Sequence, residues 1–183
     1  MAPGQWMKLA ALGPRTMSKS YFRIDLPAAA FSASLRIERV EPTTRKALRE
    51  HVERFARYFL REMHFNGLQF EAAESPQSVG YVPYRAFLFS LQGRYIGAGC
   101  FRLRDDQDPV VPWLFDWLWL HPYVRRKGHL SCAWPELIKA FDAPDPGTEP
   151  GSLGDDDRRP FRLAKPISPA MTGFLERIAW NEL

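Results

Sequence analysis

The sequence has little cysteine and little histidine: two cysteines and four histidines stand among its 183 residues. Cys100 and Cys132 are too few for a disulfide framework, and no cysteines and histidines are spaced like the ligands of a zinc site. No apolar run approaches the roughly 20 residues that a helix needs to cross a bilayer. We therefore expect no metal, no membrane partner and a location in the reducing cytoplasm.

Length and composition predict one domain. A single core is typical of a chain of 183 residues, and 45% of the side chains are hydrophobic. Residues 1–20 lack the sustained apolar stretch of a signal peptide, so we expect a disordered leader followed by one domain over 21–183. Residues 142–160 are rich in Pro, Gly and Asp, which predicts a mobile acidic insertion in that domain.

The apolar pattern predicts alternating strands and helices. Residues 111–120 are rich in Trp, Phe and Leu, which indicates a central strand buried on both faces. From 45 to 64, apolar residues recur every three to four positions, as in an amphipathic helix with Arg and Glu on its outer face. In chain order we expect a strand (34–40), a helix (45–64), a hairpin (84–91 and 95–103), the central strand (111–120), a helix (131–141), a short strand (161–165) and a last helix from 168.

A basic turn joins the central strand to the helix that Ser131 opens. The N–H groups and the positive dipole end of a helix start favour phosphate. Arg125, Arg126 and Lys127 add positive charge there, and Gly128 lets the backbone approach a ligand closely. The turn therefore favours an anion such as a pyrophosphate, and a solvated basic loop is the plain alternative.

The strand, turn and helix resemble the acyl-CoA-binding motif of the GNAT N-acetyltransferase superfamily. That motif is an apolar strand, often a Pro, and then Arg/Gln-x-x-Gly-x-Gly/Ala. Pro122, Arg125 and Gly128 fit it, while Leu130 stands where Gly or Ala is usual. The chain also resembles the eukaryotic cohesin acetyltransferases, which share an Arg-Arg-Lys turn and end soon after their last helix.

The predicted order of elements over roughly 34–178 is similar to that of the acetyltransferase core. The resemblance implies an α/β (α+β) fold, in which a mixed, mainly antiparallel sheet is flanked by helices. The family's usual final strands are expected to be missing, because the chain stops at Leu183. Those strands help to shape the acceptor site in most members.

The resemblance also implies acetyl-CoA as the co-substrate. Its pantetheine arm would lie along the end of the central strand, where a backbone N–H would polarise the thioester carbonyl, and its pyrophosphate would take the N–H groups of the turn. The residues expected to bind it are Leu118, Trp119, Leu120, Arg125, Arg126, Lys127, Gly128, His129, Leu130 and Ser131.

Asp116 is the first candidate for the general base, since it is the only carboxylate in the central strand. An apolar setting would raise its pKa toward a useful value. Strict alternation would give it the same face as Leu118 and Leu120. A structural ion pair with Arg102 or Arg85 is the equally weighted alternative.

His121 is the second candidate, as a base or a proton relay, and an exposed histidine at the end of a strand is the alternative. For the general acid, many family members use a Tyr at the position of Leu175, so Tyr123 and Ser131 are the nearby substitutes. Cys132 could act as a nucleophile, although a small buried cysteine is the more ordinary interpretation.

Two functions fit these observations. The first is an acyl-CoA N-acyltransferase that moves an acetyl or short acyl group to an amine, on a small molecule or a protein. The alternative is a non-catalytic acyl-CoA-binding or protein-interaction module. The net charge of +4 suits an anionic ligand, whereas nucleic acid is not favoured because the basic run is short. A homodimer is left open.

Overall fold

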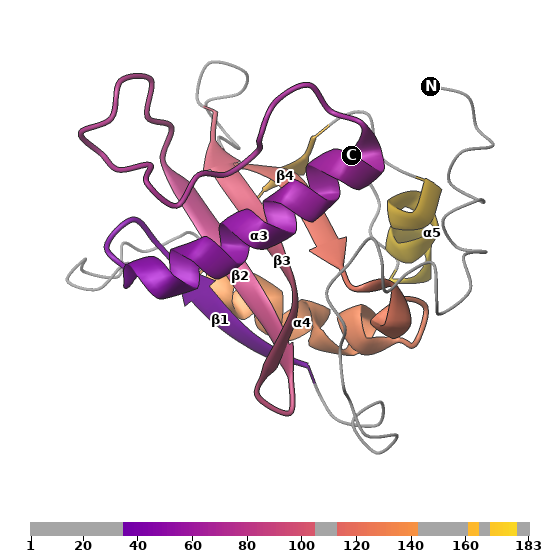
Figure 1. The fold of residues 1–183 in the computed structure, drawn as a ribbon. Helices are drawn as coiled ribbons and strands as arrows, with labels where there is room; N and C mark the ends of the chain where they lie inside the picture. Colours follow the sequence, from indigo (N-terminus) through magenta and orange to yellow (C-terminus); the bar gives the residue numbers. More distant parts are fainter. Residues whose placement is uncertain (1–34, 105–112, 143–160, 165–168, 179–183) are drawn as a thin grey trace.

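The structure, a computed structural model, describes residues 35–104, 113–142, 161–164 and 169–178. In this part of the chain, one five-stranded sheet of order β1-β2-β3-β4-β5 carries three helices (Figure 1). The elements are β1 (Arg36–Val40), α3 (Lys46–Met63), β2 (Tyr84–Leu91), β3 (Arg94–Leu103), β4 (Trp113–Leu120), the short 3-10 helix η2 (Pro122–Val124), α4 (His129–Asp142), β5 (Arg162–Leu163) and α5 (Pro169–Arg177).

The sheet is mixed and mainly antiparallel, as predicted. Strands β1 to β4 pair antiparallel in sequence order, and β5 pairs parallel to β4. The order of elements along the chain also agrees with the prediction. The expected leader and most of the expected insertion fall in 1–34 and 143–160, which lie outside the described residues.

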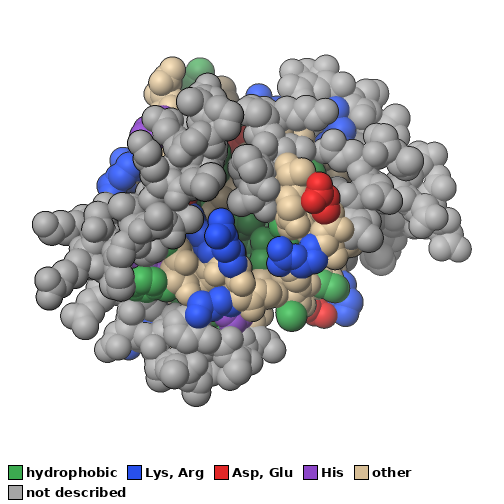
Figure 2. Space-filling view, turned by 90° about the vertical axis from the view of Figure 1, so that its right-hand side faces the viewer, with side chains coloured by type: hydrophobic (Ala, Val, Ile, Leu, Met, Phe, Trp, Pro, Cys, Tyr) green, Lys and Arg blue, Asp and Glu red, His purple; other side chains and the backbone are tan. Residues whose placement is uncertain are grey.

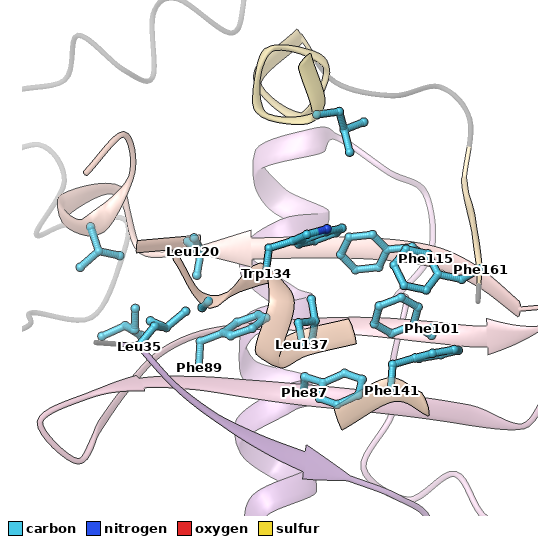
Figure 3. Close-up of a cluster of buried hydrophobic side chains, with 14 of the residues drawn as sticks. Leu35, Phe87, Phe89, Phe101, Phe115, Leu120, Trp134, Leu137, Phe141 and Phe161 are labelled. Carbon is cyan, nitrogen blue, oxygen red and sulfur yellow. The ribbon is translucent and has the colours of Figure 1, made fainter. Parts of the chain in front are cut away.

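Two apolar cores lie on the two faces of the sheet. Helix α3 covers one face with the predicted stripe of apolar residues, among them Val52 and Phe55. Helices α4 and α5 cover the other face, where Trp134 and Leu175 are buried. Figure 3 shows the aromatic side chains of this second core packed between the sheet and α4. Aromatic residues of β4 are buried on both sides, which confirms the prediction of a central strand.

Helix α4 begins at His129, so the prediction that Ser131 opens it is wrong by two residues. Gly128 adopts a φ of +79°, which glycine reaches at little cost. The amide of Cys132 then donates to the Gly128 carbonyl at 3.0 Å, and this bond closes the first turn. The expectation that Cys132 is buried is also wrong, because the residue lies on the exposed face of the helix.

The register between β3 and β4 shifts at Asp116. Cys100 pairs with Trp117 and Phe101 pairs with Phe115, which leaves Asp116 as an extra residue, in the manner of a β-bulge. The alternation of β4 therefore changes phase in mid-strand. Phe115 and Leu118 both pack on the α4 side, so the strict alternation expected for this strand is wrong.

Candidate functional site

Within the residues that the structure describes, a strand covers the outer edge of β4 along its first half only. Strand β5 pairs with Leu114 and Phe115, and Ala164 donates its amide to the Phe115 carbonyl at 3.0 Å. On the other edge, β3 stays paired with β4 as far as Leu120. From Leu118 to Leu120, β4 therefore has a strand neighbour on one side only within the described residues.

Main-chain groups of β4 point out of this open edge. The amide of His121 donates to Ile96 on β3 at 2.7 Å. Because main-chain groups alternate in direction along a strand, those of Leu118 and Leu120 point away from β3. The Leu120 carbonyl accepts a hydrogen bond at 2.7 Å from Arg125 Nε, which agrees with this direction.

A pocket of about 230 Å³ opens at this edge. All ten residues predicted to bind acetyl-CoA line it, so the structure brings the whole predicted set together. The remaining lining comes from Phe59, Glu62 and Met63 of α3, Val124 of η2, and Met171, Phe174 and Arg177 of α5. The pocket is smaller than the roughly 300–1,000 Å³ of a drug-sized site, which suits one extended arm of a larger ligand.

The pocket combines an apolar lining with a cationic rim. Arg126, Lys127 and Arg177 are exposed residues that line it. Figure 2 shows Lys and Arg side chains around a hydrophobic hollow on this side of the molecule. Arg126 adopts a left-handed φ of +61° beside Gly128, and the amides at the start of α4 follow at once. Such a turn at a helix start attracts anions.

Glu62 is a pocket residue that the sequence interpretation missed. Its carboxylate is buried, with 6% of the side chain exposed. It accepts hydrogen bonds from the Trp119 indole at 2.9 Å and from both terminal nitrogens of Arg125, Nη2 at 2.7 Å. Position 62 is three residues after Phe59 on the apolar stripe of α3, and a carboxylate there signals a buried partner.

Asp116 does not line this pocket. Its carboxylate lies 3.5 Å from Arg102 Nε, and Arg102 is itself held by Glu74 at 3.0 and 3.2 Å. Burial raises the pKa of Asp116 above its ordinary value, against the opposing charges of Arg102 and Arg104. The geometry is that of the structural ion pair that the sequence left as an alternative.

His121 is buried rather than exposed, with 1% of its surface accessible. Its Nδ1 accepts a hydrogen bond from the Tyr123 amide at 3.3 Å, and its ring packs edge-on against Trp119. His121 and Tyr123 are not among the residues that line the pocket, whereas Ser131 is. Both predicted bases therefore lie outside the lining of the pocket that collects the predicted co-substrate residues.

Comparisons with known proteins give no match, whether with family models, curated proteins or solved structures. Among the described residues, no group of three or more His, Cys, Asp or Glu side chains could hold a metal ion. No helix in that same part of the chain is long and apolar enough to cross a membrane.

Proposed function

We propose that this chain transfers an acetyl or other short acyl group from acyl-CoA to an amine. The observation that supports the proposal most is the pocket at the open edge of β4. The ten residues that the resemblance to the GNAT superfamily implies for binding acetyl-CoA all line this pocket.

The pocket fits the two chemically different parts of acyl-CoA. The apolar lining, with Phe59, Met63 and Leu118, suits the pantetheine arm and the acyl group. The exposed cations Arg126 and Lys127 and the amides at the start of α4 suit the pyrophosphate. Outward-facing amides at Leu118 and Leu120 are the groups that would polarise the thioester carbonyl.

The thioester supplies an activated acyl group. Attack by a neutral amine forms a carbon–nitrogen bond, the carbon–sulfur bond breaks, and CoA leaves as the thiol after the amine gives up a proton. Since Asp116 and His121 lie outside the pocket lining, the amine proton passes to solvent at the mouth of the pocket, and solvent gives a proton to the departing thiolate.

A non-catalytic acyl-CoA-binding module is the second candidate. The observation that favours it is the state of the carboxylates. Among the described lining residues, Glu62 is the one acid, and it is already bonded to Arg125 and Trp119. The carboxylate that lines the pocket is therefore engaged by the protein and is not a ready base.

The first experiment is thermal unfolding of the pure protein with acetyl-CoA, desulfo-CoA or ATP. A ligand at about 100 times its dissociation constant stabilises the folded state by roughly 2.7 kcal/mol. We expect stabilisation by both CoA compounds and none by ATP. Release of free CoA with a panel of amines then separates the transferase from the binding module, and the absence of any CoA shift would refute both.

A variant in the turn tests the same pocket. Gly128→Glu puts a carboxylate on the cationic rim, so CoA affinity is expected to fall at least about tenfold. The matched control is Gly128→Asn, because Asn tolerates the left-handed φ of +79° without adding charge. Among the described residues, no atom outside the adjacent residues lies within 4 Å of a Cβ at this position, so both side chains have room, although this φ strains the backbone of Glu more than that of Asn. Undiminished CoA binding by the Glu variant would mean that the anion site lies elsewhere.

A further inference from the structure

Arg125 was expected to bind the donor's phosphates, but its guanidinium is occupied by the protein. Nε donates to the Leu120 carbonyl, and the two terminal nitrogens donate to Glu62. The guanidinium carbon also lies 5.5 Å from the centre of the Trp119 ring. All three guanidinium nitrogens of Arg125 therefore donate to protein acceptors. The side chain is partly buried, with 33% of it exposed.

Glu62 makes this arrangement electrically neutral. A buried carboxylate is costly unless it is paired and hydrogen-bonded, and here a guanidinium and an indole N–H satisfy it. The same pairing offsets the charge of Arg125, which lowers its attraction for a phosphate in the pocket. Arg126 and Lys127 remain exposed on the rim.

We propose that Glu62 and Arg125 are positioning residues, which fix the open edge of β4 against α3 and leave the donor's phosphates to Arg126, Lys127 and the turn amides. The inference rests on the proposed function only in naming acyl-CoA as the ligand.

We call the contacts of Arg125 with Glu62 and with the Leu120 carbonyl the brace. The position of Leu120 explains why the brace matters. Its carbonyl belongs to the half of β4 that has no outer strand neighbour in the described part of the chain, and Arg125 Nε donates to it where such a strand would. Trp119 stacks on Phe55 of α3, with ring centres 5.5 Å apart, so the brace reaches the helix by two routes. Amides meant to polarise a thioester must be held still before the ligand arrives.

Amide hydrogen exchange of the peptide over 118–121 tests the brace without any ligand. We expect faster exchange in Glu62→Gln and in Arg125→Lys, since lysine keeps the charge but loses the fork that joins Leu120 to Glu62. Arg126→Lys is the matched control and should exchange like the unaltered protein. Unchanged exchange in both brace variants would overturn the proposal.

Affinity for CoA, measured by calorimetry, separates positioning from direct phosphate binding. Arg125→Gln leaves the Glu62 charge uncompensated and should weaken CoA binding at least about tenfold. The double variant Glu62→Gln/Arg125→Gln restores neutrality and should regain at least about threefold of that loss. If Arg125 contacts the phosphates, the double variant will bind as weakly as Arg125→Gln, which contradicts the proposal.

These two readouts keep the brace apart from the proposed function. If the protein does not bind CoA but the amides over 118–121 exchange faster in the brace variants, the brace is supported and the acyl-CoA assignment is refuted. Arg125→Lys and Glu62→Gln are close in size to the residues they replace, and circular dichroism of each variant establishes that it folds before exchange is measured.

Discussion

The two halves of β4 share one strand but have opposite surroundings. The first half, with Phe115, lies between β3 and β5 and is closed on both edges. The second half, from Leu118 to Leu120, is paired with β3 alone among the described residues and lines the pocket. Burying both edges of a strand uses its backbone groups for the fold, whereas leaving one edge open keeps them available for a ligand.

The buried ion pairs of the two halves also differ in composition and position. In the closed half, Asp116 and Glu74 surround Arg102, so two carboxylates share one guanidinium away from the pocket. In the open half, one carboxylate and one guanidinium, those of Glu62 and Arg125, are paired inside the pocket lining. The comparison indicates that the first ion-pair group lies away from the pocket, whereas the second forms part of the pocket wall.

The largest effect is expected from Gly97→Val, where β3 meets the open half of β4. A Cβ on Gly97 would lie 2.3 Å from the Trp119 carbonyl oxygen and 2.7 Å from Leu120 Cδ2. Because the first contact is with backbone, relief requires the strands to separate. We expect a loss of about 3 kcal/mol or more, or no folded protein, measured by urea unfolding.

Gly173→Ala on α5 is the control for that prediction. Gly173 is helical, and in the described part of the chain nothing outside the helix backbone and the adjacent residues lies within 4 Å of a Cβ at this position. The free energy of unfolding of the Gly173→Ala variant should be higher by roughly 0.5–1 kcal/mol. If Gly97→Val is tolerated as well as this change, the close approach of β3 to the open half is not required for the fold.

The next effect is expected from Phe115→Ala in the closed half. The Phe115 ring is 5% exposed and stacks on Phe101, with ring centres 4.5 Å apart. Truncating a buried Phe costs roughly 3–5 kcal/mol, so urea unfolding should show a loss in this range. Leu118→Ala, at a half-buried position in the open half, should cost less stability but weaken CoA binding. Equal stability losses with no change in affinity would erase the distinction between the halves.

The parts of the fold that the sequence predicted are those built from residues close together in the chain. The ten pocket residues lie within Leu118 to Ser131. The local hydrophobic pattern and turn chemistry predicted the strand, turn and helix of this segment, and the GNAT resemblance implied which of its residues bind the ligand. The order of strands and helices followed from the same kind of local signal. The start of α4 was missed because Ser131 resembles a helix cap, while the turn at Gly128 began the helix earlier.

Contacts between distant segments explain what the sequence did not predict. Glu62 and Arg125 are 63 residues apart, and no local pattern pairs them. The bulge at Asp116 depends on the register of β3 against β4. A shift of the register by one residue moves a side chain to the opposite face of the sheet. The candidate base was therefore sought on the wrong face, and the one carboxylate that lines the pocket, among the described residues, was assigned to the outside of a helix.

The smallest effect expected is the pH dependence that Asp116 gives to stability. Burial raises its pKa, so the folded protein holds this proton more tightly than the unfolded chain does. As the pH rises from about 4 through the raised pKa, the unfolded chain loses the proton first, and ionisation of Asp116 destabilises the fold. The stability of the unaltered protein relative to Asp116→Asn should therefore fall with rising pH, measured by urea unfolding from pH 4 to 7. Glu136→Gln, which removes an exposed carboxylate, controls for the loss of one negative charge. A relative stability that rises with pH would mean that Arg102 outweighs burial, and the closed half would then gain stability from its ion pair.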